Sequence, residues 1–145
     1  MLQASRRRWR LFYLGMGCVC LAWQAVAQGP TLTTVSDTVF RADGSPAAGT
    51  ILISWPPFTT AGGATVAAGN TNVPLGTNGS FTAQLAPNAG ANPAGTVYTV
   101  TYQLTDGTVK TENWSIGTTS PETISRVRTL AGTNTQLAQA ATSNM

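Results

Sequence analysis

The fold of this chain is decided by the stretch Thr96-Val-Tyr-Thr-Val-Thr-Tyr-Gln-Leu-Thr-Asp-Gly-Thr-Val-Lys-Thr-Glu-Asn-Trp-Ser-Ile116. In its first half, aromatic and aliphatic residues alternate with threonine and glutamine, which is the two-residue period of a half-buried β-strand. The dipeptide Asp106-Gly107 then separates two runs of strand-forming residues, as it does in tight hairpin turns. The stretch therefore predicts an antiparallel hairpin with strands at 96–105 and 108–116.

The same period recurs at 50–55 and 80–85, and no stretch before residue 129 shows a helical repeat. We expect seven or eight short strands, at 31–35, 38–41, 50–55, 65–75 (in one piece or two), 80–85, 96–105, 108–116 and 123–128. Short strands at this spacing predict an all-β domain. The expected architecture is a single antiparallel Greek-key β-sandwich, immunoglobulin-like or transthyretin-like.

The apolar positions of four of these strands are expected to line one shared core between two sheets. These positions are Ile51, Ile53, Trp55, Phe81, Leu85, Tyr98, Val100, Tyr102 and Leu104.

The connections between strands carry further signals. Asn78-Gly79 is predicted to join its two flanking strands in a second hairpin. The segments 59–68 and 86–95, which are rich in Gly, Ala, Asn and Pro, are expected to cross between the two sheets. Val109 and Trp114 fall on opposite faces of one strand, which predicts either a bulge or a strand that is covered on both faces.

Residues 1–27 have the three parts of a cleaved, helical signal peptide. Four arginines lie between Arg6 and Arg10, an uncharged, mostly apolar run of 13 residues covers 11–23, and Ala25-Val26-Ala27 follows as a cleavage pattern. The alternative is an uncleaved membrane anchor, which needs about 20 apolar residues. We therefore expect the mature chain to begin at Gln28 and to be exported, to the periplasm, the cell surface or the medium.

Two details of the export route stay open. Ser5-Arg6-Arg7-Arg8-Trp9 partly resembles a twin-arginine signal, but Arg10 stands where that pattern prefers an apolar residue, which favours ordinary secretion. Cys18 is a candidate lipid acceptor, although Gly15 stands where a lipoprotein signal has leucine. Both cysteines of the chain, Cys18 and Cys20, lie in this segment. The mature domain, predicted at 28–128, must then fold without disulfides.

Charge and residue types exclude several function classes. Beyond residue 27 the chain has four basic and five acidic residues, so this part lacks the excess of basic residues that is typical of a nucleic-acid-binding protein. The chain has no histidine, which removes Ser-His-Asp and Cys-His nucleophiles and imidazole metal sites. Asp43 and Asp106 are explained as turn residues. The sequence places no obvious apolar neighbourhood around the other three carboxylates. We expect no enzyme activity, no metal and no cofactor.

Two tryptophans are the candidate site residues. Trp114 and Trp55 could stack on sugar rings if they were exposed on a flat face, although aromatic residues at strand spacing more often lie in the core. Trp114 stands out because its position in the alternation disagrees with that of Val109 in the same strand.

Several segments, in order along the chain, resemble a family of exported bacterial proteins that is frequent in soil acidobacteria. They are residues 39–58, 85–90, 98–107, 111–114 and 127–128. The N-terminal module of this family is similar to transthyretin-like or carboxypeptidase-regulatory-like sandwiches. In its longer members a helical connector and a repetitive region follow, similar to tail fibres or β-helices. The family has no established catalytic site, so the resemblance implies no catalytic residue.

These observations favour a non-enzymatic structural or interaction module of the cell envelope or of a surface appendage. Such a module would associate through sheet edges, expected at 31–35 and 123–128, or through the polar segment 129–145, a tail or the start of a helical connector. Its partners would be proteins, including copies of itself, and it would meet the membrane only during export. The alternative is a carbohydrate-binding module that uses exposed aromatic residues on a polysaccharide.

Processing of the signal peptide is directly testable. We expect mass spectrometry of the secreted protein to find Gln28 at the N-terminus, free or cyclised, and no lipid, because the Ala25-Val26-Ala27 spacing favours cleavage after Ala27. An acylated N-terminus at Cys18 would contradict this expectation.

Overall fold

The computed structural model describes residues 28–129, and the regular structure in this part of the chain is almost entirely β-strand. The predicted signal peptide and all of the predicted tail beyond Thr129 lie outside the described residues. No helix within 28–129 is long and apolar enough to cross a membrane.

The larger sheet is built around the hairpin that the sequence predicts. Its five strands, in spatial order, are β5 (Gly69–Pro74), β2 (Gly49–Trp55), β7 (Tyr98–Leu104), β8 (Val109–Trp114) and β9 (Arg128–Thr129). All neighbouring pairs are antiparallel. The Asp106-Gly107 turn joins β7 to β8 as predicted, with the Oδ1 of Asp106 accepting the backbone N–H of Thr108 at 2.9 Å.

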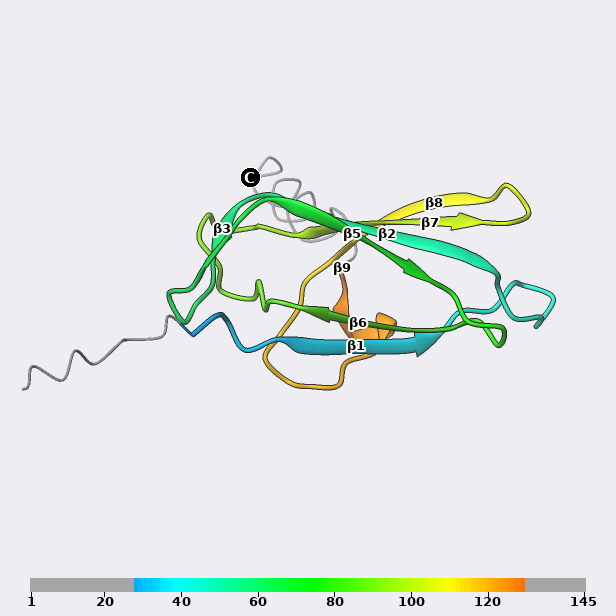
Figure 1. Cartoon of the computed structure of the whole chain (residues 1–145), viewed down its shortest axis with the longest axis horizontal. Helices are drawn as coiled ribbons and strands as arrows, with labels where there is room; N and C mark the ends of the chain where they lie inside the picture. Colours follow the sequence, from blue (N-terminus) through cyan, green and yellow to red (C-terminus); the bar gives the residue numbers. More distant parts are fainter. Residues whose placement is uncertain (1–27, 130–145) are drawn as a thin grey trace, which may run out of the picture.

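The second layer consists of β1 (Thr33–Thr38) and β6 (Ser80–Leu85), which pair antiparallel. Figure 1 shows β1 and β6 below β2, β5, β7 and β8. A short hairpin of β3 (Phe58–Thr59) and β4 (Thr65–Val66) follows β2. The predicted all-β antiparallel sandwich is therefore confirmed, whereas its Greek-key connectivity stays a prediction.

The core lies between the two layers, where the inward side chains of both sheets meet. Seven of the nine predicted core residues are buried, and the other two, Trp55 and Leu104, are partly buried against them. The rings of Phe81 on β6 and Trp114 on β8 stack across the layers with centroids 6.0 Å apart. The two-residue period therefore identified the interior face correctly on every strand that carried it.

Two predicted strand assignments are wrong. The sequence predicts two strands at 31–35 and 38–41, but β1 is one continuous strand because its backbone is paired on both sides. It has β6 on one side, and on the other the backbone N–H of Ser36 donates to the carbonyl of Glu122 at 3.0 Å. β1 is therefore not an edge strand, which contradicts the expectation that this stretch forms a free edge.

The predicted strand at 123–128 is mostly a helical turn, α1 (Ile124–Val127). Ile124 and Val127 are both buried, and residues three apart share one side of a helix but opposite faces of a strand. The Oδ2 of Asp37 accepts the backbone N–H of Ile124 at 3.0 Å, which satisfies a donor at the start of the turn. The alternation at 123–128 predicts a strand, but only a helical turn can bury both Ile124 and Val127 on the side that packs against β1.

Two connections also differ from the prediction. The turn at Asn78-Gly79 forms, and Gly79 has a φ of +79°, but it passes the chain from β5 in the larger sheet to β6 in the smaller one. It is a crossing and not a hairpin. The segment 59–68 does not cross, because it forms the β3–β4 hairpin and returns to β5, beside β2.

The segment 86–95 crosses between the sheets as predicted, and one buried side chain organises it. Asn88 is 3 % exposed, and its Nδ2 donates to the carbonyl of Thr96 at 2.7 Å. Its Oδ1 accepts the backbone N–H of Ile116. The amide therefore replaces ladder hydrogen bonds that this irregular segment cannot make itself.

The opposite placement of Val109 and Trp114 needs neither of the predicted explanations. β8 pairs with β7 in an unbroken register from Val109 to Trp114, so there is no bulge in this strand. Val109 is 66 % exposed and simply points to the outer face of the sheet, whereas Trp114 is fully buried. Both alternatives, the bulge and the doubly covered strand, are therefore wrong.

Truncation of the core should separate inward from outward positions. We expect Ile53→Ala to lower the free energy of unfolding by about 2–5 kcal/mol, because Ile53 is fully buried. The matched change on the outer face, Thr99→Ala on β7, should stay within about 0.5 kcal/mol. Urea unfolding of residues 28–145, which contain the whole core, measures both, and equal effects would contradict the facing of these strands.

Candidate functional site

The most organised polar group of the described chain surrounds the carboxylate of Glu112. Glu112 lies on β8 two residues before Trp114, so both side chains are on the inward face of the strand. Across the ladder, Glu112 is opposite Val100, and Trp114 is opposite Tyr98. A carboxylate is thus held at the border of the core and needs partners there.

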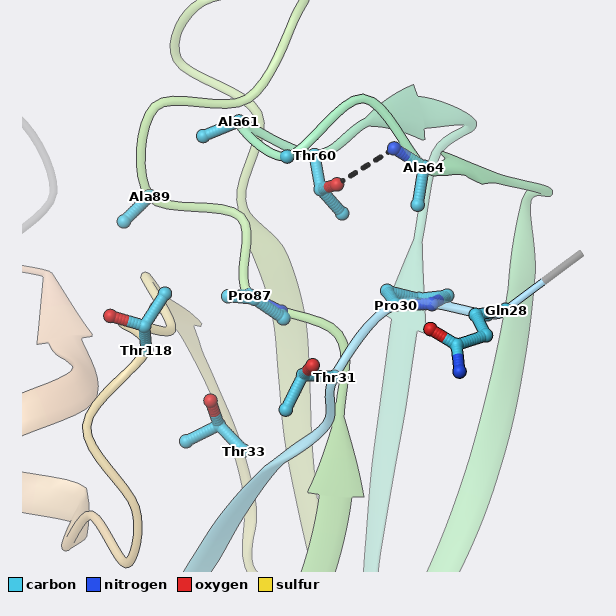
Figure 2. A pocket seen from close by; sticks show the side chains of 12 residues that line it. Gln28, Pro30, Thr31, Thr33, Thr60, Ala61, Ala64, Pro87, Ala89 and Thr118 are labelled. Atoms are coloured by element: carbon cyan, nitrogen blue, oxygen red, sulfur yellow. Dashed lines mark hydrogen bonds between the residues drawn. The ribbon is translucent and has the colours of Figure 1, made fainter.

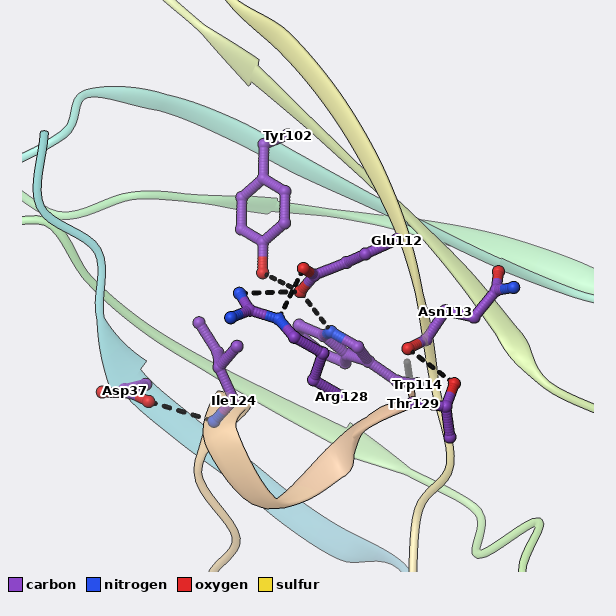
Figure 3. Close-up of polar contacts among 8 residues, drawn as sticks. All are labelled: Asp37, Tyr102, Glu112, Asn113, Trp114, Ile124, Arg128 and Thr129. Atoms are coloured by element: carbon purple, nitrogen blue, oxygen red, sulfur yellow. Dashed lines mark hydrogen bonds and ion pairs between the residues drawn. The ribbon is translucent and has the colours of Figure 1, made fainter. Parts of the chain in front are cut away.

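Three side chains supply those partners, as Figure 3 shows. The Oε1 of Glu112 accepts the hydroxyl of Tyr102 and the indole N–H of Trp114, each at 2.7 Å. The Oε2 accepts the Nε of Arg128 at 2.7 Å, and this contact is also an ion pair. We call these four residues the Glu112 cluster.

The cluster keeps its carboxylate ionised. Burial raises the pKa of Glu112, but the hydrogen bonds from Trp114, Tyr102 and Arg128 outweigh burial and hold this pKa below its ordinary value. Burial and the adjacent carboxylate raise the pKa of the Tyr102 hydroxyl, which therefore remains a donor. An ionised carboxylate surrounded by donors is a poor general acid or base.

The position of Arg128 gives the cluster a structural role. Arg128 belongs to β9, which pairs with the end of β8, and the backbone N–H of Ser115 donates to the carbonyl of Val127 at 2.7 Å. The hydroxyl of Thr129 donates to the carbonyl of Asn113 at 3.0 Å. The Glu112 cluster therefore fastens the last described segment to the larger sheet.

Of the hollows on the described surface, two bear on function, one at the Glu112 cluster and one near Gln28. The first, of about 410 Å³, is lined by three members of the Glu112 cluster (Tyr102, Glu112 and Arg128) and by Val39, Leu104, Thr108 and Lys110. The other, of about 360 Å³, lies near Gln28 and is lined by uncharged residues, mainly Thr, Ala, Gly and Pro (Figure 2).

The hydroxyls of this second hollow are partly committed to the fold. The Oγ1 of Thr60 accepts the backbone N–H of Ala64 at 3.1 Å, and the hydroxyl of Thr33 donates to the carbonyl of Gly117 at 2.6 Å. The remaining polar side chains of this hollow, Gln28, Thr31 and Thr118, can form hydrogen bonds but cannot transfer a proton at neutral pH.

Trp114 cannot serve as the predicted sugar-stacking residue. Its side chain is fully buried, one ring face stacks on Phe81, and its indole N–H is bound to Glu112. The prediction for Trp114 is therefore wrong. Trp114 is the last residue of β8 and its side chain is on the face of the strand that points into the core.

Trp55 is partly exposed, and the prediction of sugar stacking there stays a prediction. Its indole N–H donates to the carbonyl of Ala67 at 2.8 Å, and its ring meets that of Tyr98 with centroids 5.6 Å apart. The ring also covers Gly69 on the neighbouring strand, where a Cβ would lie 3.0 Å from it. The structure does not bring Trp55 and Trp114 together into one platform.

Sequence reasoning missed the Glu112 cluster. The available signal was parity, since Glu112 and Trp114 are two residues apart and must share a face. That signal becomes decisive only once Trp114 is known to be buried. The sequence pattern does not identify the partner Arg128, because it predicts an edge strand at 123–128.

Within residues 28–129 no three His, Cys, Asp or Glu side chains gather as metal ligands. A scan against models of protein families and a search of curated proteins found no match to the chain.

Removing the negative charge of the cluster should destabilise the domain. We expect Glu112→Gln to lower the free energy of unfolding by about 1–3 kcal/mol, because Arg128 loses its ion pair and an amide cannot accept from all three donors. Asp43→Asn removes the same charge from an exposed turn, where the amide oxygen can still accept from Ser45, and should have little effect. Urea unfolding compares them, and equal losses would contradict a special role for Glu112.

The cluster also predicts a pH dependence with a definite sign. The pKa of Glu112 is lower in the folded than in the unfolded chain, where it has its ordinary value of 4.5. The ionised carboxylate therefore stabilises the fold at every pH above that value. That stability is lost as the pH falls through the folded-state pKa. Urea unfolding between about pH 7 and about pH 3 should show this loss in the wild type and a smaller one in Glu112→Gln. Parallel curves would refute the assignment.

Proposed function

We propose that this domain is a non-enzymatic, exported structural or interaction module of the cell envelope or of a surface appendage, and that it associates through the edges of its sheets. The observation that carries the proposal is a pair of outermost strands, β5 and β6, without a charged side chain on either. A short turn connects them, so both edges belong to the same side of the sandwich.

Each of these strands leaves backbone groups directed outward. On β5, the backbone N–H of Leu75 donates to the carbonyl of Gly49, so the odd-numbered residues of this strand form the backbone hydrogen bonds to β2. The backbone N–H and C=O groups of Asn70 and Asn72 therefore point away from β2, past the edge of the sheet. On β6, the backbone N–H of Val39 donates to the carbonyl of Gly79, so here too the odd-numbered residues bond to the neighbouring strand, β1. The backbone groups of Thr82 and Gln84 therefore point away from β1.

Natural sandwiches block such edges with charge, proline, bulges or covering segments. Here β1 is covered by the segment around Glu122, and β8 is covered at its end by β9. β5 has only Pro74 as a blocking residue, and β6 has none. Open, neutral edges favour pairing with another chain over binding of a small molecule.

The non-enzymatic part of the proposal is supported by the carboxylates, since every acidic side chain is engaged in the fold. Asp43 and Asp106 accept backbone bonds in turns, and Asp37 accepts the N–H of Ile124. Glu112 belongs to its cluster, and Glu122 accepts the N–H of Gly117 at 3.4 Å. The exported location rests on the signal-peptide pattern at 1–27.

The test is the association state of residues 28–145 by sedimentation and light scattering, from micromolar to millimolar concentration. We expect concentration-dependent association, and we expect the double edge variant Asn72→Lys/Gln84→Lys to abolish it, because two added charges resist pairing.

The matched control, Thr99→Lys/Gln103→Lys, adds the same charge to the outer face of the central strand β7 and should leave association intact. A wild type that stays monomeric throughout, or an edge variant that associates normally, would refute the proposal.

A further inference from the structure

We propose that β6 pairs antiparallel with β6 of a second copy of this chain, about a two-fold axis at Ala83, so that the two small sheets join into one. The inference rests on the proposed function and names its partner and its contact strand. It follows from three features of β6: the free groups on its edge, the symmetry of their placement, and the absence of charge.

An added strand would stabilise the smaller sheet more than the larger one. The smaller sheet contains only β1 and β6, with the segment at Glu122 joined to β1 by a single bridge, whereas the larger sheet has five strands. Two-stranded sheets are marginal by themselves. The free edge of β5 is also poorer, because its outward position Pro74 has no N–H to donate.

The outward backbone groups of β6 complement themselves. Thr82 and Gln84 each direct an N–H and a carbonyl away from β1, and neither makes another hydrogen bond within residues 28–129. With a two-fold axis at Ala83, Thr82 of one copy lies opposite Gln84 of the other, and each such pair exchanges two backbone hydrogen bonds. The contact uses the same residues on both copies and therefore closes as a dimer.

The side chains of β6 are compatible with this approach. Ala83, on the axis, points inward and is 6 % exposed, so its methyl group leaves room for the second strand. Phe81 and Leu85 are already buried beneath their own sheet. The outer face carries Thr82 and Gln84, and neither is charged, so the axis brings no like charges together.

The register can be tested with cysteines, because residues 28–145 contain none. A mixture of the single variants Thr82→Cys and Gln84→Cys should form a disulfide-linked mixed dimer under mild oxidation faster than either variant alone, since these two positions face each other. The matched β5 mixture, Asn70→Cys with Asn72→Cys, should remain largely monomeric. Faster linkage on β5, or no preference for the mixed β6 dimer, would overturn the inference.

Proline substitutions separate this inference from the proposed function. Thr82→Pro removes an outward N–H without breaking the ladder to β1 and should raise the dimer dissociation constant of residues 28–145 by about tenfold or more. Asn72→Pro does the same to β5 and should leave dimerisation unchanged. Circular dichroism checks that both variants fold, and Gln84→Lys replaces Thr82→Pro if that variant does not.

Each outcome of this comparison decides something. Loss of dimerisation only in Asn72→Pro would overturn the pairing of β6 and leave edge association standing. Loss in both folded variants would overturn β6 as the sole contact. Normal dimerisation in both, or a wild type that never associates, would overturn the inference and the proposed function together.

Discussion

The packing of Trp114 between the two layers is the contact on which the rest of this domain depends. Its ring stacks on Phe81 of the smaller sheet, while its backbone pairs with Tyr98 on one side and with Arg128 on the other. A large aromatic side chain buries more apolar area than any other residue, so one such contact can hold two sheets in register. Its indole N–H, which would be costly to bury unpaired, finds the carboxylate of Glu112 at 2.7 Å.

That hydrogen bond brings a second constraint, because a carboxylate at the border of the core must itself be satisfied. Tyr102 and Arg128 complete its shell, and Arg128 can reach it only because α1 returns the chain from the smaller sheet to the edge of β8. The acidic residue, the helical turn and the last strand are therefore one unit. A polar network that is fully satisfied specifies a single arrangement, whereas a partly satisfied one destabilises the fold.

The same connections decide which strands are left open. The turn at Asn78-Gly79 carries the chain directly from the outermost strand of one sheet to the outermost strand of the other, so β5 and β6 lie on one side of the sandwich. The opposite side is covered in part by α1, β9 and the segment at Glu122, and the stretch of β8 that β9 leaves unpaired carries Lys110 and Glu112. The edge at β8 is thus partly paired and carries charged residues, whereas the edges at β5 and β6 present free backbone groups and no charge. This asymmetry suits a module that joins other chains through one side.

The sequence by itself determined the strands β2, β6, β7 and β8, the inward faces of the first three, and the Asp106-Gly107 hairpin. These features follow from the two-residue period and from local turn chemistry, which act over a few neighbouring residues. Only the tertiary structure decided the layer to which each strand belongs, the helical turn at 124–127, the burial of Trp114 and the partners of Glu112. All of these depend on contacts between residues far apart in the chain, such as Asp37 with Ile124 and Glu112 with Arg128. A local pattern specifies which face of a strand is apolar, but only long-range packing specifies what that face meets.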